Sequence, residues 1–375
     1  MRQSTDLITL ATPPTTFSTK ILTNDLIFDL IFCFSSPGSL VCLERTCMQL
    51  QAAVKSYFRR TFNINRHFSR FFDNPQDFRS LQARTATLVS GSNALQFFSR
   101  ITYEDSDLDL YVYYKHRLEV GHWLIQNGYT YKPNAVQNTN FDLASKECTL
   151  NGSQADEPLK YHMKGVASVF TFTKPCGDDA SKELKVQAVV VSNAPMEVIL
   201  NFHSTIVFNV ISWDRAYSLY PRATFEDHRG LWLRPDYADD EGETDIIKKY
   251  RLRGWKFEWE RGALDGDDPA FGDAARWIGD TQSWVIKLDT HGVTRPPPVN
   301  EFSQPLTRDP CCMTSWWMTL AGSGGPHEPP TAAIDFVFSY PTLSYKYASL
   351  YGPWRQAISI GFAGLRKDEP LRRIH

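Results

Sequence analysis

The feature that most constrains this chain is a Gly-Ser turn followed, one helix length later, by two aspartates in an alternating run. The turn is Ser90-Gly91-Ser92, and the run is Ser106-Asp107-Leu108-Asp109-Leu110. Successive side chains of a strand point to opposite faces. Asp107 and Asp109 are therefore expected on one face, with the leucines on the other. The run predicts a strand that has an acidic face and an apolar face.

The segment between the two motifs predicts a helix that begins just after Gly91-Ser92. Residues 93–100 contain neither Gly nor Pro. Together with the residues on either side, they are long enough for about three turns of α-helix. The free N–H groups and positive dipole end of such a helix bind anions, while Gly91 allows close backbone approach and Ser92 adds a hydroxyl. Phosphates held beside two carboxylates that bind Mg²⁺ are the parts needed for nucleotidyl transfer. Taken singly, the motifs indicate only a turn and a strand end with two solvated acids.

At these residues the chain resembles the DNA polymerase beta type nucleotidyltransferase superfamily. More closely, it is similar to fungal proteins that join an F-box-like amino terminus to such a domain. The likeness covers roughly residues 24 to 290, and it is carried by the following stretches: 24–64, 90–98, 106–112, 202–205 and 216–221. The resemblance implies an α/β (α+β) fold in which an F-box-like helical unit precedes a nucleotidyltransferase-like mixed sheet with flanking helices.

The resemblance also implies the site residues. Asp107 and Asp109 would hold Mg²⁺ and be catalytic, and Gly91 and Ser92 would bind a nucleoside triphosphate. Active members carry a third carboxylate on a later strand, for which residues 183–191 are the candidate. The corresponding position is Gln187, whose amide can ligate a metal but cannot act as a general base.

Because Gln187 stands in the third position, nucleotide or metal binding is a firmer expectation than catalysis. Asp142 and Glu147 are the candidate replacements for the third acid. The sequence thus leaves open a metal-dependent transferase and a pseudoenzyme, and it favours the pseudoenzyme.

The amino-terminal part predicts two amphipathic helices that resemble an F-box. One begins near Asn24, and the other runs from Ser39 to about residue 58, both with apolar residues at helical spacing. The resemblance implies docking on the adaptor of a cullin-RING ubiquitin ligase through four leucines: Leu26, Leu30, Leu40 and Leu43. The alternative is a helical hairpin that packs on the protein's own core.

These patterns divide the chain into a disordered tail (1–20), an F-box-like region (21–75), a nucleotidyltransferase-like domain (76–225) and a carboxy-terminal elaboration (226–375). In the domain we expect a helix at 116–127, a loop at 135–157, and strands at 166–173 and 183–191. A helix from Pro195 to about Tyr217 is expected to carry His203, Ser204 and Thr205. Beyond the domain we expect a strand at 284–288.

Two basic segments have alternative interpretations. Arginines and phenylalanines alternate over 59–85, which indicates an amphipathic connector or, less favoured, a grip on a phosphate backbone. Residues 248–253 form a basic run near several tryptophans, which indicates a solvated helix face or the floor of a nucleotide site.

Charge and cysteine usage narrow the choice of partners and compartment. The net charge of −2 gives no broad attraction to nucleic acid or anionic membrane. The seven cysteines have no metal or disulfide spacing, which is typical of reduced thiols. No secretory signal and no membrane-spanning run is recognised. We therefore expect an intracellular protein, cytoplasmic or nuclear, without a membrane partner.

Overall fold

The computed structural model describes residues 24–150, 164–176, 179–233, 245–258, 268–271, 276–295, 309–312, 314–316, 318–319, 331–332, 336–338 and 345–349. The tail expected at 1–20 lies outside the described residues. Backbone contacts divide the chain into two compact units, Met1–Phe62 and Asn63–His375. Within the described residues, no helix has the length and apolar character needed to cross a bilayer.

The described part of the smaller unit consists of three helices: α1 (Asp25–Phe32), α2 (Pro37–Glu44) and α3 (Met48–Thr61). The Asn24 side chain accepts hydrogen bonds from the first N–H groups of α1, and Ser36 caps α2, whose first residue is a proline. The helices share one apolar cluster, made of Phe28, Phe32, Leu40, Ala53, Val54 and Tyr57. An ion pair of 2.6 Å between Arg60 and Asp29 joins α3 to α1.

This arrangement corrects two expectations for the amino-terminal part. The helix expected from Ser39 to about residue 58 is broken between α2 and α3, where Cys47 has an extended backbone and is the N-cap of α3. The four leucines expected to face a partner also separate. Leu26 and Leu30 are 82% and 65% exposed, whereas Leu40 is 1% exposed and Leu43 packs against the core. Leu40 and Leu43 therefore stabilise the helical unit itself.

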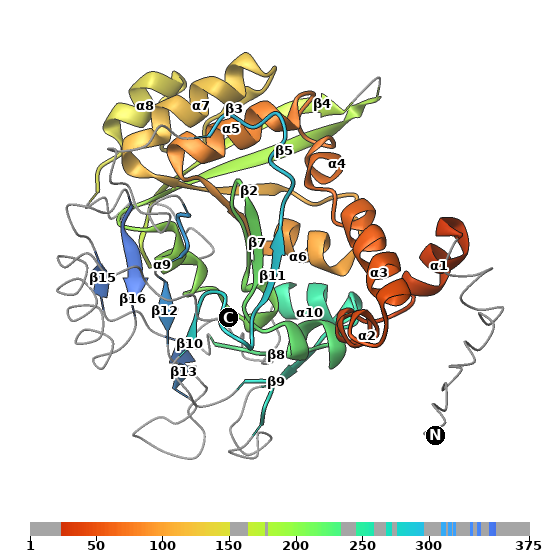
Figure 1. Ribbon diagram of the computed structural model, residues 1–375. Coiled ribbons are helices and arrows are strands. Elements are labelled where there is room, and N and C mark those ends of the chain that lie inside the picture. Colours follow the sequence, from red (N-terminus) through yellow and green to blue (C-terminus); the bar gives the residue numbers. More distant parts are fainter. Residues whose placement is uncertain are drawn as a thin grey trace, which may run out of the picture. The chain divides into compact units, whose positions relative to one another are not determined.

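The larger unit is built on one eight-stranded sheet, in the order β11-β7-β6-β1-β2-β5-β4-β3 (Figure 1). Its strands are β1 (Leu88–Ser90), β2 (Leu108–Tyr113), β3 (Thr130–Lys132), β4 (Val166–Cys176), β5 (Asp179–Val191), β6 (Asn209–Ile211), β7 (Arg215–Ser218) and β11 (Trp284–Lys287). β2 and β5 are parallel, and the other neighbours are antiparallel. The fold is thus mixed α/β around a mixed sheet, as the sequence predicted.

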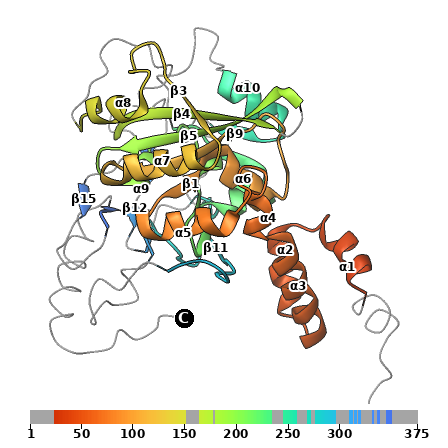
Figure 2. The same cartoon turned by 90° about the horizontal axis from the view of Figure 1, so that it is seen from above.

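The described residues of the larger unit also form α-helices, some of which pack on this sheet. They are α4 (Ile64–Phe68), α5 (Pro75–Thr85), α6 (Gly91–Ser99), α7 (Arg117–Gln126), α8 (Phe141–Glu147), α9 (Pro195–Ile199) and α10 (Asp245–Leu252). α6 contacts β1, β2 and β6, while α7 contacts β2, β3 and β5. Figure 2 shows β4 and β5 as one long antiparallel pair beside α7. α6 follows β1 directly, so its first residues lie at the end of a central strand.

Shorter strands lie beyond the main sheet. β8 (Arg229–Leu231) pairs with β9 (Lys256–Glu258). A second sheet contains β10 (Arg276–Trp277), β12 (Ser315–Trp316), β16 (Tyr347–Ser349) and β15 (Phe336–Phe338), and a separate pair contains β13 (Met318–Thr319) and β14 (Thr331–Ala332).

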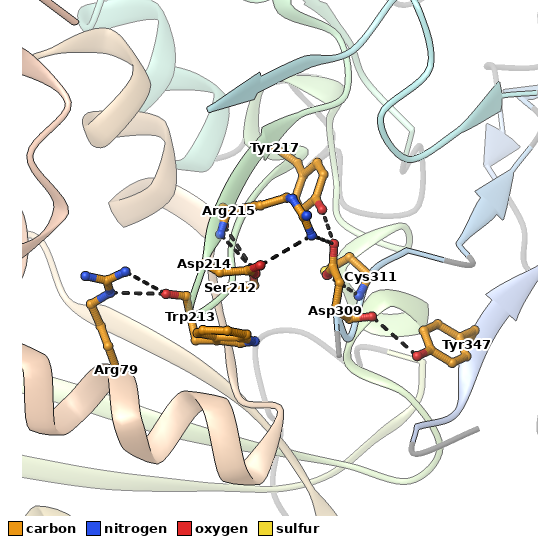
Figure 3. A network of polar contacts seen from close by, with 9 residues as sticks. All are labelled: Arg79, Ser212, Trp213, Asp214, Arg215, Tyr217, Asp309, Cys311 and Tyr347. Carbon is orange, nitrogen blue, oxygen red and sulfur yellow. Dashed lines mark hydrogen bonds and ion pairs between the residues drawn. The ribbon is translucent and has the colours of Figure 1, made fainter. Parts of the chain in front are cut away.

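A polar network connects these carboxy-terminal pieces to the main sheet (Figure 3). Asp309 accepts hydrogen bonds from Arg215 Nη1 at 3.0 Å and from the Tyr217 hydroxyl, both on β7. Its own backbone carbonyl accepts a hydrogen bond of 3.3 Å from the hydroxyl of Tyr347 on β16. One buried residue thus joins two sheets, through its carboxylate to β7 and through its backbone carbonyl to β16.

Most expected elements are confirmed, but two are wrong. Helix α7 and strands β4, β5 and β11 lie where the sequence predicted them. The predicted loop 135–157 contains α8, which Asn140 caps through the Leu143 N–H. The helix expected from Pro195 to Tyr217 ends at Ile199, and β6 and β7 follow it. Val210 and Ile211 favour a strand because both side chains are branched at Cβ, and both are fully buried.

Candidate functional site

The turn between β1 and α6 lies directly against Asp109. Ser90, the last residue of β1, is in register with Asp109 of β2. Gly91 follows with φ +68°, a left-handed conformation that favours glycine. A Cβ atom at Gly91 would lie 3.0 Å from Asp109 Oδ2, so the glycine is required both for its conformation and for the close approach of the carboxylate. The sequence predicted this juxtaposition.

Asp107 and Asp109 lie on the same face, as the alternation predicted. Leu108, Leu110 and Val112 are fully buried on the opposite face, where they pack in the core. Burial, followed by the like charge of Asp107, raises the pKa of Asp109 to about 7, whereas Lys185 and Lys249 oppose the shift. These influences require the two acids and the two lysines to be near one another.

The neighbouring strand β5 adds an amide and an ammonium to this face. Gln187 is in register with Asp109. Two residues earlier, on the same face, Lys185 Nζ lies 2.8 Å from Asp107 Oδ2. The position expected for a third carboxylate thus holds Gln187 beside Asp109, and Asp107 is already paired with a cation.

Gln96 of α6 fixes the loop that leads into Asp107. Its Oε1 accepts a hydrogen bond of 2.7 Å from the Tyr103 N–H, and its Nε2 donates one of 2.5 Å to Ser106 Oγ. Arg70 donates to the carbonyls of Tyr103 and Glu104 in the same loop. The Ser92 hydroxyl, expected to meet phosphate, lies 3.4 Å from Ser106 Oγ. The loop is therefore held against the first turn of α6.

Helix α10 brings further basic groups to the acids. Burial lowers the pKa of Lys249, as does nearby Arg253, while Asp107 and Asp109 oppose that shift. Arg253 lies 3.7 Å above the ring of Tyr103, in the loop that Gln96 holds. We name the Asp109 site after its central residue and define it as Gly91, Asp107, Asp109, Lys185, Gln187 and Lys249.

The other residues singled out from the sequence lie elsewhere or have structural partners. His203 and Ser204 precede a short 3-10 helix that begins at Thr205, so the three residues do not share the long helix that the sequence predicted. Ser204 forms an isolated bridge with Trp232, and Thr205 Oγ1 accepts a hydrogen bond from the Leu231 N–H. These contacts join the segment to β8.

The two candidate replacements for the third acid are engaged at α8. Asp142 lies 2.5 Å from His122 Nε2 of α7, and Glu147 accepts a hydrogen bond from Asn138. These pairings hold both carboxylates at α8 and its preceding loop, so neither takes the position that Gln187 occupies beside Asp109.

The donor set of the Asp109 site carries less negative charge than that of a magnesium centre with three carboxylates. Such a centre needs hard oxygen ligands, chiefly carboxylates, to offset the charge of the metal. Asp107 is paired with Lys185, and the third position is an amide. Across the described residues, no group of three or more His, Cys, Asp or Glu side chains could hold a metal ion.

No family model, curated protein or solved structure matches the chain. Its function is therefore inferred from the geometry of the Asp109 site.

Sequence reasoning missed Lys185 and did not place the basic run at 248–253 beside the two acids. Lys185 stands two residues before Gln187, so strand alternation already places it on the face of the acids. Lys249 and Arg253 belong to the basic run for which the sequence allowed two interpretations, a solvated helix face or the floor of a nucleotide site. Their approach to the acids depends on the position of α10, which no local pattern specifies.

Proposed function

We propose that this chain is a nucleotide-binding protein with a nucleotidyltransferase-like domain that lacks transferase activity of its own. The observation that carries the proposal is the contact of Gly91 with Asp109, which puts the amino end of α6 beside the acid pair. Free N–H groups at a helix start bind phosphate oxygens. Lys185 and Lys249 add positive charge where a triphosphate would extend.

The proposed lack of transfer is supported by the donor set. Nucleotidyl transfer needs metal-bound carboxylates that stabilise the developing charge and a base that takes the acceptor proton. Gln187 can do neither, and Lys185 already neutralises Asp107.

A binding assay and an incorporation assay test the two halves of this proposal. Each of the four ribonucleoside triphosphates is titrated into the full chain, and the melting temperature is followed, because a ligand that binds the native state raises it. We expect at least one nucleotide to raise it, and Gly91→Val to abolish the rise. Incorporation of labelled nucleotide that Asp107→Asn eliminates would disprove the pseudoenzyme assignment.

We propose as a second function that α1 docks on a ubiquitin-ligase adaptor. The observation that favours it is the exposure of Leu26 and Leu30, four residues apart on one helix, together with Phe34 at 86% just beyond it. Large apolar side chains exposed in one patch are typical of interaction surfaces. The resemblance to F-box proteins supplies the partner class, which is intracellular.

Co-purification of the full chain with the adaptor tests this second function. Leu26→Asp with Leu30→Asp should abolish binding, while nucleotide binding persists. Met48→Asp is the matched control, because Met48 is equally exposed but begins α3. If the unaltered protein does not bind the adaptor, this second function is wrong.

A further inference from the structure

We infer that the Asp109 site binds its nucleoside triphosphate without a divalent cation, with Lys185 supplying the positive charge that a metal ion would otherwise bring. This inference rests on the proposed nucleotide-binding function. It specifies the form of the ligand as the metal-free polyphosphate anion.

Lys185 occupies the place beside Asp107 that a metal ion would need. Its ammonium lies 2.8 Å from Asp107 Oδ2, within the range of a charge-assisted hydrogen bond. A metal ion bound to that oxygen would have to displace the ammonium and meet its repulsion at close range. The same ammonium has further N–H donors, so it can hold Asp107 and a phosphate oxygen together.

The charge around the two acids is more positive than negative. Two carboxylates, Asp107 and Asp109, are accompanied by three cationic side chains: Lys185, Lys249 and Arg253. Arg253 stacks on Tyr103, and its Nη1 is buried without a hydrogen-bond partner among the described residues. A buried donor in this state is costly and is satisfied by an acceptor. The surroundings of the acids therefore suit an anion better than a second cation.

The replacement of an acid by Gln187 also favours an anion. A carboxylate at this position would repel a phosphate, whereas the amide Nε2 can donate a hydrogen bond to it. Gln187 is in register with Asp109, and neither side chain has a hydrogen bond within the described residues. The amide of Gln187 is thus available to donate a hydrogen bond to a ligand on this face.

Calorimetric titration of the full chain tests the inference directly. ATP, GTP, CTP and UTP are each titrated in excess EDTA and again in excess Mg²⁺. We expect the nucleotide that binds to have dissociation constants within about threefold of each other in the two buffers. Binding only in Mg²⁺ would overturn the inference and leave the proposed function intact. If no nucleotide binds in either buffer, both are overturned.

Variants of Lys185 test whether this residue is responsible for nucleotide binding in EDTA. Lys185→Met should weaken binding in EDTA by about tenfold or more, because a charge-assisted hydrogen bond is lost. Lys185→Arg keeps the charge and should retain most of the affinity. It serves as the second test if Lys185→Met folds poorly. Lys182→Met is the matched control, because Lys182 is on the same strand but 67% exposed. Unchanged affinity of a folded Lys185→Met protein would refute the assignment.

Discussion

Asp109 is a carboxyl group whose neighbours make its ionisation costly. Burial separates it from water, and Asp107 on the same face adds repulsion, so its pKa rises to about 7. Lys185 and Lys249 limit the rise but do not cancel it. At neutral pH the carboxyl group is therefore divided between its acid and carboxylate forms, and small changes in the surrounding charge shift this balance.

The raised pKa predicts the effect of Asp109→Asn on stability. The ordinary pKa of the group is 3.8, and its pKa in the native state is about 7. Between these values the native state retains a proton that the unfolded chain has released, so this group's contribution to stability falls as the pH rises from 4 to 7. Asp109→Asn removes that decline and should raise the unfolding free energy at pH 8, relative to the unaltered protein, by up to about 4 kcal/mol.

Urea denaturation at pH 4.5 and pH 8 measures this difference. Asp105→Asn is the matched control, because Asp105 lies in the loop just before β2 with its side chain in solvent. If Asp109→Asn changes the unfolding free energy by the same amount at both pH values, the shift does not belong to Asp109.

A comparison of Gly91 with Gly254 separates two costs of adding a side chain, the strain of a positive φ and the contact with Asp109. A Cβ atom there suffers from the positive φ and also meets Asp109 Oδ2 at 3.0 Å, whereas Gly254 has φ +95° and open space around it. Gly254→Ala should cost about 1 kcal/mol from conformation alone. Gly91→Ala should cost about 1–2 kcal/mol more and weaken nucleotide binding. Thermal melts and nucleotide titrations measure both, and equal effects at the two glycines would contradict the contact.

At the scale of elements, alternation and caps predicted the strands and helices that line the Asp109 site. The acidic face of β2 followed from spacing, whereas the position of Gln187 beside Asp109 was an expectation that came from the family resemblance. The error at 195–217 has a physical reason. Apolar residues there recur at the spacing of a strand as well as at the spacing of a helix. The strand forms because β6 pairs with β1 and β7, and this pairing is not a local property of the sequence.

The conformation of the loop before β2 is held by the Gln96 side chain of α6. The substitution Gln96→Met tests this role. The substitution keeps the volume, but it leaves the Tyr103 N–H without its acceptor and removes the donor that Gln96 supplies to Ser106 Oγ. We expect a loss of about 2 kcal/mol in unfolding free energy, because unsatisfied buried groups are costly. The Tyr103 amide should also exchange with solvent faster.

Hydrogen exchange followed by mass spectrometry or NMR reports on this amide. Gln126→Met is the control, because Gln126 is exposed in the last turn of α7. Unchanged protection of Tyr103 in a folded Gln96→Met protein would rule out this positioning role.

At the scale of the whole molecule, the larger unit is joined by contacts between residues far apart in the sequence. Arg79 of α5 donates two hydrogen bonds to the Trp213 carbonyl, between β6 and β7 (Figure 3). Asp309 then connects β7 to the second sheet. These partners could not be predicted from the sequence, because they are far apart along the chain and no local pattern distinguishes any of them.

Asp309 should therefore couple the second sheet to the main one. In Asp309→Ala, the Tyr217 hydroxyl and the Cys311 N–H lose their acceptor, and Arg215 keeps only its ion pair with Asp214. Because the substitution removes a buried acceptor of hydrogen bonds from Arg215, Tyr217 and Cys311, we expect a loss of about 3 kcal/mol in unfolding free energy. Tyr217→Phe removes one hydroxyl from the same network and should cost only about 1 kcal/mol. If the two sheets still unfold together in both variants, each variant shows a single urea transition at a lower urea concentration than the unaltered protein. A separate early transition in Asp309→Ala would instead show that this carboxylate is what makes the second sheet unfold with the first.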